Sequence, residues 1–122
     1  MAASIRISPM NSLIFIHGSS DWVTPIPVDG QPVWWTSSCV ATACYPEQDG
    51  PTEIVLGNVS EVGPLAAPVF EGMVETPQRK VSVTTVADDR PVLSVGVSTL
   101  RTRVRIWHSH PRWPERVTIG LG

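Results

Sequence analysis

Hydrophobic and polar residues alternate in short runs along this chain. No window of about eleven residues keeps the helical period of about 3.6 residues, and 12 prolines spread through the 122 residues would interrupt a long helix. A period of two is typical of strands that bury one face. The pattern therefore predicts an all-β chain.

The predicted strands are short and are separated by turns. Residues 33–45 give the clearest strand, with Trp34 on the outward parity and Trp35 on the parity of the predicted core. Asp-Gly-Pro at 49–51 and Asp-Asp-Arg at 88–90 predict turns. The pattern predicts an antiparallel β-sandwich or jelly roll of about eight strands, forming a single domain over residues 1–122 around one core. The candidate strands are 5–7, 13–16, 33–45, 53–57, 69–75, 80–87, 91–97, 101–107 and 115–121.

Composition excludes two classes of protein. Hydrophobic residues make up 42% of the chain and charged residues 16%, which excludes a disordered, solvated chain. No stretch approaches the roughly 20 apolar residues of a membrane-spanning helix, and the first residues lack the basic start and apolar run of a secretory signal. We therefore expect a cytoplasmic protein that does not bind a membrane. Cys39 and Cys44 are too few for a disulfide framework, and we expect two buried thiols.

Charged residues are segregated along the sequence. Residues 7–78 carry eight carboxylates and no Lys or Arg, whereas residues 79–122 carry eight basic residues against three acids. The acids fall mostly in predicted turns. Two interpretations remain open: the acids gather into a docking surface for a basic partner, or they are scattered over the surface.

The basic stretch suggests a nucleic-acid hypothesis that the overall charge weakens. Arg101, Arg103 and Arg105 would share the outer face of one strand, with Trp107 and Trp113 close behind them. Arginine interleaved with tryptophan can hold a single nucleic-acid strand by charge and stacking. The isoelectric point of about 5.8 is acidic, however, and dedicated nucleic-acid binders are usually basic. We therefore expect no direct binding to nucleic acid.

The segment Trp107-His108-Ser109-His110-Pro111 resembles the zinc-binding motif of JAMM-type isopeptidases. Two histidines two positions apart on a strand can face one metal ion. The wider motif of that family requires a Ser and an Asp further on, where this chain has Thr118 and Leu121. The family also requires a following helix and an upstream Glu, so we predict that His108 and His110 do not form its zinc site.

A looser metal site would combine these two histidines with His17, completed by Asp21 or Glu115. Solvated loop histidines are the more common case. The sequence has no Ser-His-Asp elbow, no base partner for Cys39 and no glycine-rich phosphate loop. We therefore predict a protein that is not an enzyme and has no metal or other cofactor.

Tryptophan is abundant, with five in the chain. We expect Trp35 to anchor the core. Trp22, Trp34 and Trp113 fall in loops or on the outward parity, where aromatic side chains mark interfaces or act as lids over the end of a sandwich. Together with two acids of the predicted loops they form our candidate partner-binding set: Asp21, Trp22, Trp34, Asp49 and Trp113.

The order of elements resembles the competence protein J family, small bacterial β-proteins whose type member inhibits a nuclease. The segments that carry the resemblance are 13–17, 20–22, 34–43, 49–50, 80–85, 101–106 and 115–117. The resemblance implies a non-enzymatic inhibitor that binds a nuclease through an acidic or aromatic surface. The basic C-terminal stretch and the two histidines near it depart from the family pattern.

We therefore predict a protein-binding domain, an inhibitor or immunity-type protein against a basic nuclease. The alternative is a structural subunit of a larger particle or secretion assembly, in which acidic and basic stretches of neighbouring copies pair and the protein self-associates. The sequence does not decide between them.

Overall fold

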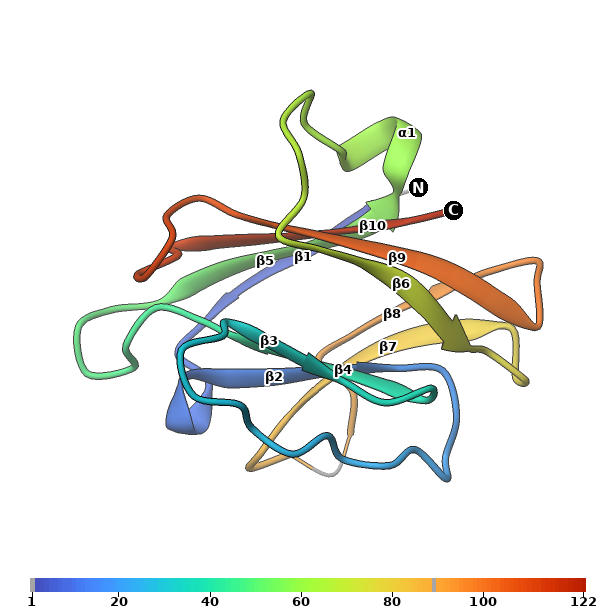
Figure 1. Cartoon of the computed structure of the whole chain (residues 1–122), viewed down its shortest axis with the longest axis horizontal. Coiled ribbons are helices and arrows are strands. Elements are labelled where there is room, and N and C mark those ends of the chain that lie inside the picture. The colour runs from blue at the N-terminus through green and yellow to red at the C-terminus, as the bar shows by residue number, and fades with distance from the viewer. Residues whose placement is uncertain (1, 89) are drawn as a thin grey trace.

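The computed structural model describes residues 2–88 and 90–122, within which ten strands form two facing five-stranded sheets (Figure 1). Sheet A has the order β1-β5-β10-β9-β6 and sheet B the order β3-β4-β2-β7-β8. Neighbouring strands are antiparallel except β5 and β10, which run parallel. The strands of sheet A are β1 (Ala3–Ile7), β5 (Thr52–Asn58), β6 (Phe70–Glu75), β9 (Arg101–His108) and β10 (Arg116–Leu121). Those of sheet B are β2 (Leu13–His17), β3 (Val33–Trp35), β4 (Cys39–Ala43), β7 (Lys80–Thr85) and β8 (Leu93–Gly96).

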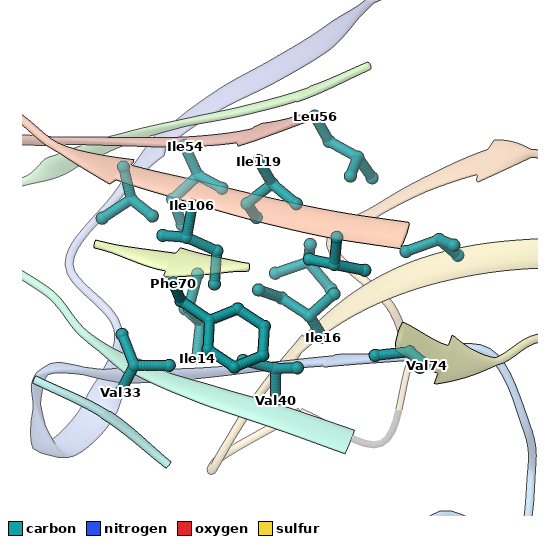
Figure 2. Close-up of a cluster of buried hydrophobic side chains, with 14 of the residues drawn as sticks. Ile14, Ile16, Val33, Val40, Ile54, Leu56, Phe70, Val74, Ile106 and Ile119 are labelled. Atoms are coloured by element: carbon teal, nitrogen blue, oxygen red, sulfur yellow. The ribbon is translucent and has the colours of Figure 1, made fainter. Parts of the chain in front are cut away.

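The core lies between the two sheets and is aliphatic. Ile14 and Ile16 of sheet B face Ile54, Ile106 and Ile119 of sheet A, and all five are fully buried (Figure 2). Each such side chain stabilises the fold by about 1.5–3 kcal/mol through burial alone. The all-β class predicted from the alternation is confirmed. The predicted turn at 88–90 includes Asp89, which lies outside the described residues.

The predicted strand 33–45 is wrong in one respect, because it is two strands. β3 and β4 form a hairpin closed by a turn in which the Thr36 amide donates to the Cys39 carbonyl at 2.8 Å. β3 is an edge strand of sheet B, so Trp35 lies at the border of the sandwich and not at its centre. Its ring centroid is 5.1 Å from that of Phe70, which belongs to β6, an edge strand of sheet A. The Trp35 side chain is 58% exposed and does not anchor the core as expected.

The connection between β5 and β6 covers part of the outer face of sheet A. It contains the short helix α1 (Val59–Val62), and the Trp107 indole donates to the Ala66 carbonyl at 2.8 Å. A Cβ at Gly120 would lie 3.0 Å from the Trp107 ring and 3.2 Å from Val59, so glycine permits this close packing. Trp107 is consequently buried and cannot stack on a nucleic-acid base as the nucleic-acid hypothesis requires.

Helical structure in the described residues is limited to α1 and a 3-10 turn, η1 (Met10–Ser12). Neither has the length and apolar character that crossing a bilayer as a helix requires.

Candidate functional site

The connection from β2 to β3, residues 18–32, is a long loop that crosses the outer face of sheet B (Figure 1). We call it the β2–β3 loop. Beneath it lies a second, smaller hydrophobic cluster in which Phe15, Cys39 and Ala41 are buried and Trp22 and Trp34 are partly buried. The loop therefore shields part of the outer face of sheet B from solvent. Loops of this length without secondary structure are often functional.

Side chains of the sheet hold the β2–β3 loop at two points. Near its start, the Val23 amide donates to Ser38 Oγ at 2.8 Å and Thr36 Oγ1 donates to the Val23 carbonyl at 2.9 Å. Near its end, Trp34 Nε1 donates to the Val28 carbonyl at 2.9 Å. Trp34 lies half-buried on the outward parity, as predicted, and there it fastens the loop to β3.

Trp22 fastens the start of the same loop through its ring. The indole stacks on the His17 imidazole, with centroids 4.7 Å apart and planes 12° apart, and leans on Phe15 at 5.2 Å. His17 Nε2 lies 2.7 Å from Thr84 Oγ1, and burial lowers the His17 pKa below its ordinary value. The neutral imidazole is thus a fixed support for Trp22.

Between these two attachments the loop presents aliphatic side chains to solvent. Ile26 is 83% exposed, Val23 60% and Val28 49%, whereas Pro25 between them is buried against the molecule. An exposed carboxylate, Asp21, precedes this segment. Asp29, also exposed, follows it. These aliphatic side chains were not predicted as site residues, although the sequence has a signal for them in an apolar, proline-containing segment between two aspartates.

The other two predicted residues, Asp49 and Trp113, line a separate groove of about 750 Å³. We call it the end groove, because it lies between the β4–β5 and β9–β10 connections at one end of the molecule (Figure 1). Its floor carries Arg6, Glu53 and Arg116, which are neighbours in register across β1, β5 and β10. Glu53 Oε1 lies 3.3 Å from Arg116 Nε.

The structure thus divides the predicted set between two surfaces. Asp21, Trp22 and Trp34 belong to the β2–β3 loop, whereas Asp49 and Trp113 belong to the end groove. The loop leaves β2 at His17, and the end groove lies beyond the opposite end of that strand, where Leu13 pairs with Ala43.

The acidic and basic stretches of the sequence do not form separate faces on sheet A. Glu71 of β6 lies opposite Arg105 of β9, and its Oε2 is 3.2 Å from Arg105 Nε and 3.7 Å from Arg103 Nη1. Strands of the acidic stretch are hydrogen-bonded to strands of the basic stretch, so their charges interleave. Asp21 and Asp49, in contrast, form no ion pair within residues 2–88 and 90–122.

The three histidines have different environments and do not meet. His108 Nε2 lies 2.7 Å from Thr42 Oγ1 between the sheets, whereas His110 Nδ1, in the exposed turn beyond β9, accepts the amides of Arg112 and Trp113. In the part of the chain that the structure describes, no three His, Cys, Asp or Glu side chains are grouped as metal ligands. The looser site of His17, His108 and His110 is therefore not assembled.

Cys39 and Cys44 are both buried free thiols, as predicted. Burial raises the pKa of each to about 12, so both stay protonated at neutral pH. A protonated thiol is a poor nucleophile. Neither cysteine adds chemistry to the two surfaces.

No protein-family model and no curated protein sequence matches the chain. A solved structure does match, the crystal structure of ComJ, inhibitor of the DNA degrading activity of NucA, from Bacillus subtilis. The TM-score is 0.64 and the sequence identity 10%, with 98% of this chain and 93% of that chain covered. The resemblance stated from the order of elements is confirmed at the level of the fold. The chain has the all-β fold of ComJ along nearly its whole length.

Proposed function

We propose that this protein binds and inhibits a basic nuclease without catalysing a reaction itself. The fold it shares with ComJ, an inhibitor of a DNA-degrading activity, supports this class of function. The observation that carries the proposal is that Asp21 and Asp49, beside exposed or partly buried tryptophans, keep their carboxylates free of ion pairs within the described residues. Other acids, Glu53 and Glu71, already hold arginines of the same chain.

Free carboxylates suit a nuclease partner for an electrostatic reason. An enzyme that cleaves DNA must hold a phosphate backbone, and it does so with lysine and arginine. Carboxylates on an inhibitor attract those same groups, which speeds association and blocks the substrate. We assign the contact to Asp21, Trp22, Trp34, Asp49 and Trp113.

Inhibition is tested first with wild-type protein. Nuclease fractions from the cells that make the protein, with NucA of Bacillus subtilis as a second target, are assayed for cleavage of double-stranded DNA with increasing protein. We expect stoichiometric loss of cleavage for at least one nuclease. Undiminished cleavage by all of them would overturn the proposal.

The contact is tested with the double substitution Asp21→Lys and Asp49→Lys. We expect association with the inhibited nuclease to slow by roughly tenfold or more, with the effect shrinking as salt rises. The control is Glu61→Lys with Glu71→Lys, which changes net charge equally at α1 and on the outer face of sheet A, outside the β2–β3 loop and the end groove. Unchanged affinity in the first variant would show that these acids do not make the contact.

The alternative function, a subunit of a larger assembly, needs acids of one copy to meet arginines of the next. Glu53 and Glu71 meet arginines of their own chain instead. These pairs reduce the charge available for head-to-tail contacts, and for this reason we favour the inhibitor.

A further inference from the structure

We infer that residues 21–29 are the inhibitory element, a preformed apolar segment that enters a cleft with a basic rim on the nuclease. The inference rests on the proposed function, because the basic rim is argued from the chemistry of a nuclease. It goes further by naming aliphatic side chains of the β2–β3 loop, rather than the acids alone, as the main source of affinity.

The segment exposes aliphatic side chains to solvent. Ile26, Val23 and Val28 place aliphatic surface in water, on a loop whose other contacts bury Pro25 and half-bury Trp22. Apolar surface that stays exposed on a folded domain is a mark of interaction sites. Binding would remove this surface from water, which contributes about 25 cal/mol per Å² of apolar area.

The segment is already held in place in the free protein. Hydrogen bonds from Val23 to Ser38 and from Trp34 to Val28 fix its two ends, and the rings of Pro25 and Pro27 restrict the backbone between them. A flexible loop would lose conformational entropy on binding, whereas an ordered one has lost it during folding. The geometry therefore favours tight binding by a small contact.

Both ends of the segment carry a negative charge. Asp21 and Asp29 are exposed on either side of the aliphatic side chains, and neither forms an ion pair within the described residues. A cleft that binds DNA has cationic groups along its rim to hold the phosphates. An apolar tip between two carboxylates complements such a cleft in shape and in charge.

The end groove is the competing surface, and its shape and charge fit this role less well. It is concave, and its floor alternates Arg6, Glu53 and Arg116, so that a nuclease cleft would meet both signs of charge. A recess cannot enter a cleft. We therefore assign it no part in the insertion itself, and Asp49 and Trp113 contribute to the nuclease contact outside the cleft.

The test is the double substitution Ile26→Ser with Val28→Ser, assayed against the nuclease that wild-type protein inhibits. We expect inhibition to weaken by roughly ten- to a hundredfold, the effect of losing a small apolar hot spot. Both side chains are exposed, so the variant should fold, and its thermal unfolding checks this. The matched control is Leu65→Ser, an exposed leucine of the β5–β6 connection on the opposite side of the molecule (Figure 1).

Each outcome separates the inference from the function on which it rests. Absence of inhibition by wild-type protein overturns the proposed function, and the inference with it. Full inhibition by the Ile26→Ser, Val28→Ser variant overturns the inference and leaves the function intact. Equal weakening by Leu65→Ser would also overturn the inference, because the effect would not depend on the loop.

Exchange of the indole protons tests the preformed geometry without a partner. We expect the Trp34 indole N–H, which donates to Val28, to exchange with deuterium more slowly than that of Trp113, which is 52% exposed. Equal rates would show that the loop is not held and would overturn the inference.

Discussion

His108 connects the two sheets at the scale of a single residue. Its Nε2 lies 2.7 Å from Thr42 Oγ1 of the opposite sheet, and its Nδ1 is buried without a hydrogen-bond partner among the described residues. Burial lowers the pKa of the ring to about 4, whereas an unfolded chain has a histidine pKa of about 6.5. The folded protein therefore contains the neutral imidazole at neutral pH.

This shift predicts a loss of stability in mild acid. Between pH 6.5 and pH 4 the unfolded chain binds a proton that the folded chain does not, so the free energy of unfolding should fall by at most about 1.4 kcal/mol per pH unit. Above pH 6.5 the contribution of His108 should be constant. Urea unfolding at pH 7.5, 6 and 5 measures this dependence. In His108→Gln the free energy of unfolding should fall less steeply as the pH is lowered. Equal pH dependence in the variant and in wild-type protein would show that His108 does not cause the loss of stability.

Single residues also show why only some of the exposed residues of the β2–β3 loop were predicted from the sequence. Asp21 and Trp22 were singled out because acids and aromatic residues in a loop carry recognisable chemistry. Ile26 and Val28 resemble core residues in the sequence, and their exposure depends on which side of the loop faces the sheet. That orientation follows from the burial of Pro25 and the hydrogen bond of Trp34, both of which are tertiary contacts.

At the scale of an element, the order of the β2–β3 loop should depend on the hydrogen bond from Trp34 Nε1 to the Val28 carbonyl. Trp34→Phe keeps an aromatic ring against the hydrophobic cluster under the loop but removes the donor to the Val28 carbonyl. We expect the free energy of unfolding to fall by about 1 kcal/mol and residues 23–28 to become more mobile. Amide relaxation by NMR measures the mobility, with Trp113→Phe in the end groove as the control. A loop that stays ordered in Trp34→Phe would show that this bond does not hold it.

Most strands could be predicted from alternation, because each buries one face and exposes the other. β9 and β7 lie within a residue or two of their predicted ranges at 101–107 and 80–87. The hairpin of β3 and β4 was missed because its turn is Thr36-Ser37-Ser38, which contains no glycine, proline or asparagine to mark it. Hydroxyl groups close this turn instead, with the Ser38 amide donating to Thr36 Oγ1 at 3.3 Å. The missed turn placed Trp35 in the predicted core.

At the scale of the whole molecule, charge segregation along the chain did not predict charge segregation in space. β5 pairs with β10 in parallel, and β6 pairs with β9, so the acidic stretch contacts the basic stretch within sheet A. Pairing between strands so distant in sequence depends on the complete fold, and alternation within one strand carries no information about its neighbours. Asp21 and Asp49 lie instead in connections between strands, and neither forms an ion pair within the described residues.

This arrangement leads to a prediction about the size of the particle. Ion pairs within the chain occupy Glu53 and Glu71, and the formal net charge is only −2, so copies of the protein have little charge complementarity to drive head-to-tail contacts. We expect sedimentation velocity to show one species of constant size from about 20 mM to about 500 mM salt, a range over which the Debye length falls from about 20 Å to about 4 Å. Because attraction between exposed charges is screened over this range, oligomers held by charge would dissociate as salt rises. Large species at low salt that disappear at high salt would therefore favour the assembly subunit over the inhibitor.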